Sequence, residues 1–268
     1  MASNQEKIYT QYGAGFEDTR ASSSRTSGLE FHYTKKAMNE FITKDSRVLE
    51  IGCATGYYAM YFADKCKEYI GVDLFSLHID VFNKKIIENN LTNVSCQVGD
   101  ATNLNGIESS GFDVVMCLGP MYHLPPEERE LVFAECKRVC KAGGIIAFAY
   151  INKIGVYVGG CIHDEKYREI YPNEKANEYI LRQGTDDLKP GIFYFTTPEE
   201  LEEAAIRYGL SKIRNLGTDF FITMSAVDQM SDEKFELFME LADEMVSHES
   251  CTGMSNHALL ICRNEGKV

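Results

Sequence analysis

The sequence lacks any apolar run that approaches the ~20 residues a membrane-spanning helix needs. Its first residues, MASNQEKIYTQYG, also lack the charged and then apolar layout of a signal peptide. Both absences lead us to expect a soluble, cytoplasmic protein that makes no contact with a membrane.

Positive charge is scarce. Lysine and arginine number 27 against 40 aspartate and glutamate residues, and the formal net charge is −13. Proteins that grip nucleic acid over a wide surface rely on clustered positive charge, which this chain lacks. We therefore expect a small-molecule partner and consider nucleic acid unlikely. The composition does not indicate an oligomeric state.

Paired cysteines are lacking too. The nine cysteines are scattered, their number is odd, and no C-x-x-C pair occurs. This pattern is typical of buried reduced thiols and argues against a disulfide framework or a zinc site. We predict no metal centre, and nothing marks one cysteine as an activated nucleophile.

What the sequence does contain is a regular alternation of short apolar runs with longer amphipathic stretches. A chain of 268 residues, 44% hydrophobic, is enough to bury one core. Alternating strands and helices are typical of a parallel sheet covered on both faces. The predicted strands are 47–51, 68–72, 93–98, 112–118 and 145–151.

The helices are predicted from periodicity and from capping residues. Residues 20–28 are interpreted as a loop before a helix over 29–42. Thr197-Pro198-Glu199-Glu200 is a capping box that begins a helix ending at Gly209, and Ser231 caps a helix that extends to about residue 247. A helix within 126–141 is expected to end before Gly143-Gly144, and its predicted core face consists of Leu131, Val132, Cys136, Val139 and Cys140.

We expect one domain over 1–268 with two special segments. Residues 1–45 form a candidate N-terminal helical lid, and 152–196 form a long insertion after the fifth strand, without clear periodicity. A connection of that length is usually functional, which makes it a candidate substrate cap. The aromatic and histidine candidates for ligand contact, which ordinary packing explains as well, are Tyr9, Tyr12, Phe16, Tyr157, His163, Tyr167, Tyr171 and Tyr179.

The strongest motif is VLEIGCATGYYAMYFA at 48–63, in which a strand runs into a glycine turn and then a helix. Glycines at such a turn let the backbone approach a nucleotide-like ligand closely. The dinucleotide pattern G-x-G-x-x-G needs glycine where Ala54 and Tyr57 stand, which disfavours hydride transfer with NAD. Asp73 follows the second strand, where a carboxylate can accept from a ribose diol or simply cap a turn.

Further motifs follow in a fixed order along the chain: VGDATNL, FDVVMCLGPMYHL and KRVCKAGGIIAFAY. Together with the glycine turn they resemble the class I S-adenosylmethionine-dependent methyltransferases, and SGLEFHYTKK and SNHALLICRN resemble an uncharacterised bacterial branch of the small-molecule type. The resemblance implies a Rossmann-like, doubly wound α/β fold with a seven-stranded, mostly parallel sheet. Its last strand, 257–263, would lie antiparallel beside 213–223.

The resemblance also implies a cofactor, S-adenosyl-L-methionine, with S-adenosyl-L-homocysteine as its product. The methionine part would contact the glycine turn and the loop after the fourth strand, and the nucleoside would contact the ends of the second and third strands. For Leu74 and Leu118, plain core packing stays an alternative. The residues implied in cofactor binding are Glu50, Gly52, Ala54, Gly56, Asp73, Leu74, Asp100, Ala101, Leu118 and Gly119.

The loop after the fourth strand, GPMYHL, bears on the reaction. Methylases of DNA bases and of glutamine in this family carry N/D-P-P-Y/F there, and this chain has no Asn or Asp before Pro120. His123 is a candidate general base because imidazole titrates near neutrality, but it can equally pack beside the cofactor. The expected reaction is methyl transfer to an unidentified small molecule. The alternatives are an NAD-dependent oxidoreductase and a non-catalytic protein that binds the cofactor.

Overall fold

A computed structural model describes residues 19–158, 169, 171–182, 193–219 and 226–266, without the side chains of 179–182. Its centre is a seven-stranded sheet with the order β3-β2-β1-β4-β5-β7-β6. The first five strands are parallel to one another, and β7 runs antiparallel to both β5 and β6. The strands are β1 Arg47–Ile51, β2 Glu68–Asp73, β3 Val94–Val98, β4 Phe112–Cys117, β5 Cys140–Ile151, β6 Leu210–Gly217 and β7 His257–Asn264. The predicted doubly wound α/β fold is therefore confirmed, including the antiparallel last strand.

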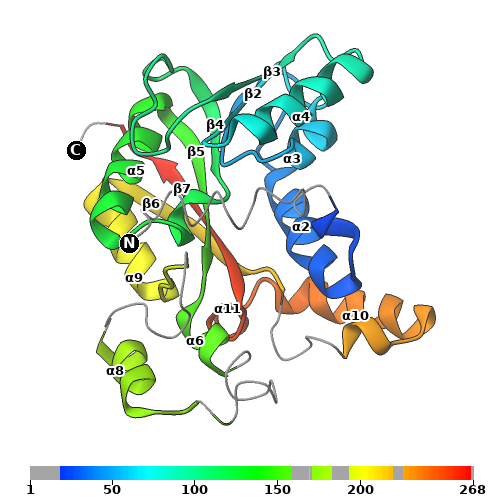
Figure 1. Ribbon diagram of the computed structural model, residues 1–268, viewed down its shortest axis with the longest axis vertical. Coiled ribbons are helices and arrows are strands. Elements are labelled where there is room, and N and C mark those ends of the chain that lie inside the picture. The colour runs from blue at the N-terminus through cyan, green and yellow to red at the C-terminus, as the bar shows by residue number, and fades with distance from the viewer. Residues whose placement is uncertain (1–18, 159–168, 170, 183–192, 220–225, 267–268) are drawn as a thin grey trace.

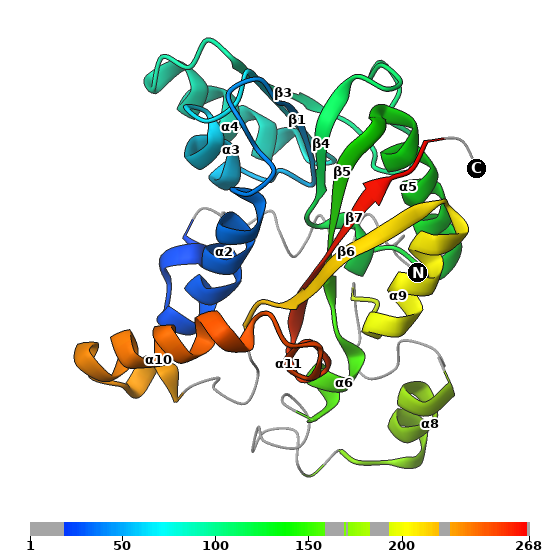
Figure 2. The same ribbon diagram turned by 180° about the vertical axis from the view of Figure 1, so that it is seen from behind.

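Helices cover both faces of this sheet (Figures 1 and 2). Alternate residues of one strand enter different cores, as Val48 of β1 packs in one apolar cluster and Leu49 in the other. α2 Arg25–Met38, α3 Tyr57–Phe62, α4 Ser76–Glu88 and α10 Asp232–Met245 contribute to the first cluster, and α5 Pro126–Val139 and α9 Pro198–Arg207 to the second. The shorter elements are η2 Arg20–Ser22, η3 Pro120–Tyr122, α6 Lys153–Gly155, α8 Glu174–Arg182, η6 Val227–Gln229 and α11 Glu249–Gly253.

The predicted helix caps are confirmed at two helices. The Thr197 side chain accepts from the Glu200 backbone, and the Glu200 side chain accepts from the Thr197 backbone, so both halves of the capping box before α9 are present. The Ser231 hydroxyl accepts from the Lys234 N–H at the start of α10. These local signals act independently of tertiary contacts, which is why they can be read from the sequence.

The first helix begins earlier than predicted. The stretch 20–28 is not a loop throughout, because α2 starts at Arg25 with Ser24 as its N-cap. The Ser24 hydroxyl accepts from the Ser27 N–H at 3.0 Å. The serines that suggested a loop therefore form a cap and the first turn of the helix.

The predicted core face of α5 is wrong at Leu131, which is 51% exposed. Phe133, at 1% exposure, is buried instead and packs against Phe148 of β5. The helix also ends at Val139, and β5 begins at Cys140, so Gly143 and Gly144 lie within the strand. A register irregularity between β4 and β5 accommodates them.

The sixth strand differs from its predicted bounds. β6 begins three residues early, at Leu210, and ends at Gly217. Residues 220–223 of the predicted strand lie outside the described residues. So do Tyr9, Tyr12, Phe16, His163 and Tyr167.

The ends of the insertion are held against the sheet. An isolated bridge joins Asn152 to Thr196 in a parallel sense. A small apolar cluster made by Tyr122, Ile151, Tyr171, Ala176 and Phe195 lies beneath it. Within the described part of the chain, no helix is both long and apolar enough to cross a membrane. The single-domain assignment and the cytoplasmic location stay predictions.

Candidate functional site

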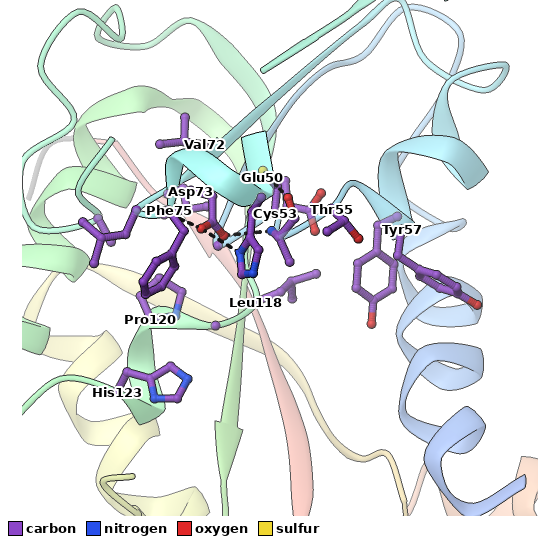
Figure 3. A pocket seen from close by; sticks show the side chains of 18 of the residues that line it. Glu50, Cys53, Thr55, Tyr57, Val72, Asp73, Phe75, Leu118, Pro120 and His123 are labelled. Atoms are coloured by element: carbon purple, nitrogen blue, oxygen red, sulfur yellow. Dashed lines mark hydrogen bonds and ion pairs between the residues drawn. The ribbon is translucent and has the colours of Figure 1, made fainter. Parts of the chain in front are cut away.

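A pocket opens at the carboxyl ends of β1, β2 and β4 (Figure 3). β1 lies between β2 and β4, so the strand order reverses direction at β1. Open α/β sheets bind their ligands at such a switch point. The pocket has a volume of about 1090 Å³, its open mouth included.

We distinguish two halves of the lining. The strand-end half consists of the loops after β1–β4, including Gly52–Thr55, Asp73–Phe75, Gly99–Ala101 and Leu118–Leu124 without Met121. The helical half consists of Arg20, Glu30, Phe31, Tyr57 and Tyr58. Nine of the ten cofactor residues implied by the resemblance line the pocket, as does His123; the exception is Gly56.

The two glycines of the turn after β1 have different surroundings. Both have positive φ, +80° at Gly52 and +84° at Gly56. A Cβ on Gly52 would lie 2.8 Å from Cδ of Pro120, so this glycine lets the loops after β1 and β4 approach each other. A Cβ on Gly56 would lie 2.4 Å from the ring of Phe82 on α4, so this glycine serves the packing of α3 on α4.

Asp73 holds the strand-end half together. Its Oδ2 accepts from the Ala54 N–H at 2.8 Å, and its Oδ1 accepts from the Phe75 N–H at 2.9 Å. His78 of α4 places Nδ1 3.2 Å from the same Oδ1. The carboxylate, only 6% exposed, thus fixes the glycine loop relative to the end of β2. Sequence reasoning missed His78, whose position on the following helix gave no motif.

Glu50 is the most deeply buried acid of the pocket, at 1% exposure. The hydroxyl of Tyr69 donates to its Oε2 at 2.6 Å. Burial raises the pKa of Glu50 to about 8; the Tyr69 hydrogen bond opposes that shift, and the nearby Asp73 carboxylate adds to it.

Asp100 begins the third loop of the pocket. Its Oδ1 accepts from both the backbone N–H and the hydroxyl of Thr102, at 2.8 and 2.7 Å. Both bonds from Thr102 go to Oδ1. Ala101 lies next to it in the lining, while Leu74 packs with Phe75 on the other wall.

The helical half was missed because it combines distant segments. Glu30 and Phe31 come from α2, whereas Tyr57 and Tyr58 begin α3. The three rings contact one another, with centroids 4.7 Å apart for Phe31 and Tyr57 and 5.6 Å apart for Phe31 and Tyr58. The result is an aromatic wall, and Tyr57 lies across the pocket from His123 (Figure 3).

Glu30 belongs to a charged network behind that wall. Arg20 donates to Oε2 of Glu30, and Nδ1 of His257 lies 4.0 Å from the same oxygen and 2.6 Å from Oδ2 of Asp219. Burial raises the pKa of Glu30, but His257 and Arg20 outweigh it, so the pKa is lowered. For His257 the effects have the opposite sign. Burial alone would lower its pKa, but the carboxylates of Glu30 and Asp219 have the larger effect, so the pKa of His257 is raised.

His123 ends the short η3 turn and is held by aromatic rings. Its ring centroid lies 4.7 Å from that of Tyr122 and 5.2 Å from that of Phe193. Phe193 belongs to the insertion and also packs against Phe75. The Tyr194 N–H donates to the Tyr122 carbonyl at 2.9 Å, which ties the end of the insertion to this loop.

The other insertion candidates lie elsewhere. Tyr171 is buried in the small apolar cluster, and the hydroxyl of Tyr157 donates to Asn177. Neither lines the pocket. Tyr179 belongs to α8, but its side chain is not described. Among the described residues, no group of three histidine, cysteine or acidic side chains is arranged to hold a metal ion.

These features define a Rossmann-like α/β protein with a pocket for a nucleotide-type cofactor at the switch point of its sheet. Residues 48–144 match the family described as "Methyltransferase domain". This match and the relatives below support a class I S-adenosylmethionine-dependent methyltransferase with S-adenosylmethionine as its cofactor. The match disfavours the NAD-dependent oxidoreductase that the sequence left open.

Individual relatives agree with this assignment. The ubiquinone biosynthesis O-methyltransferase of Neisseria meningitidis is 25% identical over 180 residues, which cover 66% of this chain and 68% of the relative. An S-adenosylmethionine-dependent methyltransferase from Mesorhizobium loti has a similar fold, with a TM-score of 0.57 and 14% identity, over 89% of this chain and 99% of its own. A geranyl diphosphate C-methyltransferase from Streptomyces coelicolor gives a TM-score of 0.55 and 12% identity, over 87% and 78%. The last two likenesses show the fold alone.

Proposed function

We propose that this chain methylates a small-molecule acceptor that binds in the helical half of the pocket, opposite the cofactor in the strand-end half. The observation that carries the proposal is the continuity of the two halves in one pocket. S-adenosylmethionine, when bound, supplies an electrophilic methyl group on a positively charged sulfur. The task of the protein is then to hold an acceptor lone pair in line with that group.

For the ribose, Asp73 is the proposed acceptor. A carboxylate offers about four acceptor positions. Ala54, Phe75 and His78 already contact Asp73, and among the described residues Oδ2 accepts from Ala54 alone. We therefore propose that Oδ2 accepts from one ribose hydroxyl. The second ribose hydroxyl would then lie on the side of the carboxylate that faces His78.

For the adenine, Asp100 and its neighbours form the proposed subsite. Thr102 holds Oδ1 of Asp100, which leaves Oδ2 as the acceptor for the exocyclic amino group. Leu74 and Phe75 provide an apolar wall, and the Ala101 backbone borders the ring edge. A flat apolar slot with one acid at its end suits a purine that carries an amino group.

For the methionine part, the proposed contacts come from the loops after β1 and β4. Gly52 and Gly119 approach each other closely, and Ala54 adopts φ 43° with its N–H bound to Asp73. Backbone without bulky side chains thus borders this end of the pocket. Leu118 and the buried carboxyl of Glu50 complete it.

The acceptor is proposed to lie between the aromatic wall and His123. Phe31, Tyr57 and Tyr58 supply faces that suit an apolar or flat molecule and a nearby sulfonium. The net charge of −13 disfavours a nucleic acid. His123 is packed between Tyr122 and Phe193, which supports a role in positioning the acceptor. In the same proposal the insertion, through Phe193, sets the shape of this wall, and the protein acts in the cytoplasm.

Two measurements test this function. Isothermal titration calorimetry should show binding of S-adenosylmethionine and S-adenosylhomocysteine but not of NAD. Incubation with methyl-labelled cofactor and a panel of phenols, amines, thiols and carboxylic acids, read by mass spectrometry, should show the gain of one labelled methyl group in one class. Binding without transfer to any small molecule or to cell metabolites would favour a non-catalytic cofactor-binding protein.

A further inference from the structure

Two glutamates line the same pocket in opposite electrostatic settings. Glu30 has Arg20 as an ion-pair partner and His257 4.0 Å away. Glu50 has one hydrogen bond among the described residues, from the neutral hydroxyl of Tyr69 at 2.6 Å. Figure 3 shows Glu50 at the inner end of the pocket, beside Cys53 and Asp73.

The described groups that act electrostatically on Glu50 provide no positive charge. Tyr69 and Asp73 face it from β2, Cys53 from the loop after β1, and Tyr58 from α3. All four are acids, and burial raises the pKa of Cys53, Tyr58 and Tyr69, which keeps them neutral. In the described part of the chain, no lysine, arginine or histidine counts among the groups that act on Glu50.

A carboxyl with these surroundings favours its neutral form. The side chain is almost sealed from water, and ionisation places a negative charge near the Asp73 carboxylate. Burial therefore raises the pKa of Glu50 to about 8, while the cationic neighbours of Glu30 lower the pKa of that carboxyl. The two acids thus differ in protonation around pH 7.

The part of the cofactor proposed to lie here carries a positively charged α-ammonium group. We propose that Glu50 is the charge-sensing residue of the cofactor site: it is protonated in the empty pocket and loses its proton when the α-ammonium group binds beside it. The inference rests on the proposed cofactor placement. Cofactor binding would then release one proton, which the placement of the cofactor alone does not require.

The proton balance is simple. The carboxyl O–H bond breaks, the proton passes to the solvent buffer, and an ammonium N–H donates to the resulting carboxylate. No other bond changes. Below about pH 8, cofactor affinity should then rise with pH by up to about tenfold per unit, because each binding event releases up to one proton.

Calorimetry counts that proton directly. S-adenosylhomocysteine, which carries the α-ammonium group but no sulfonium, is titrated into the full chain at pH 6.5 in two buffers of different ionisation enthalpy. The expected release is close to one proton per ligand bound. Glu50→Gln should reduce it to near zero, whereas Glu30→Gln should leave it unchanged, because Glu30 is already ionised.

A second variant keeps the inference testable even if the Glu50→Gln protein does not fold. Tyr69→Phe removes the one hydrogen bond from the described residues that opposes protonation of Glu50, so proton release should persist and extend to higher pH. Binding without proton release by the unaltered protein would overturn the inference and leave the proposed function intact. Release with S-adenosylmethionine alone would overturn the choice of the ammonium group. Failure to bind either ligand would overturn the proposed function itself.

Discussion

The two halves of the pocket are built in different ways. The strand-end half comes from one stretch of the chain, roughly 50–124, in which each loop follows a strand of the sheet. The helical half brings α2 against the start of α3 and depends on β7 for the support of Glu30. The first half is therefore specified locally, and the second only by tertiary packing. In the proposed function, cofactor binding and acceptor choice are divided between the same two halves.

The largest expected effect concerns the scaffold of the strand-end half. Gly56→Ala should lower the free energy of unfolding by about 2–4 kcal/mol, since it adds left-handed strain and a clash with Phe82. Gly106→Ala is the matched control, because Gly106 also has positive φ, +86°, but has nothing within 4 Å of a Cβ. It should cost only about 1 kcal/mol. Urea denaturation measures both, and equal losses would contradict the packing role of Gly56.

The next effect concerns the cofactor. Asp73→Asn should weaken S-adenosylmethionine binding by about tenfold or more, ~1.5 kcal/mol, because a ribose hydroxyl loses a charged acceptor in a largely buried site. Asp80→Asn, on the exposed side of α4, is the control and should bind normally. Calorimetry decides between them. An unchanged dissociation constant for Asp73→Asn would remove this residue from the ribose subsite.

The difference between the two halves explains which features of the site could be predicted from the sequence. The glycine turn, Asp73 and the helix cap at Thr197 could be named because they are local signals, whereas Asp100 and Leu118 were implied by the family resemblance. Leu131 was placed on the wrong face because periodicity alone does not fix the rotation of a helix against the sheet. Tyr57 and Tyr58 lie in the 48–63 motif, and Glu30 lies in SGLEFHYTKK, but neither pattern assigned these residues to the pocket. Glu30 becomes part of a site only when α2 packs beside α3 and β7 places His257 near it.

His123 belongs to the strand-end half, across the pocket from Tyr57, and allows a smaller, sharper test. His123→Ala should lower kcat/KM for the acceptor about tenfold, because the ring fills the space between Tyr122 and Phe193. His123→Phe should retain most of the activity, since a ring remains. Rates measured with the acceptor identified by the methyl-label screen decide the role. Losses of ~100-fold in both variants, with a pH profile that changes between 5 and 8, would instead identify His123 as a general base.

The smallest effect concerns the support of the helical half. The folded-state pKa of His257 is raised, because the carboxylates of Glu30 and Asp219 outweigh the effect of burial. A group with a raised folded-state pKa stabilises the fold most fully below its unfolded pKa of about 6.5, and that contribution is lost as pH rises through the folded-state value. His257→Gln should therefore lower the free energy of unfolding by about 1 kcal/mol at pH 5.5 and by less at pH 9. His248→Gln, on an exposed residue, is the matched control and should show no such difference. Urea denaturation at both pH values measures the change, and an equal loss at pH 5.5 and 9 would show that the imidazolium charge does not hold α2 to β7.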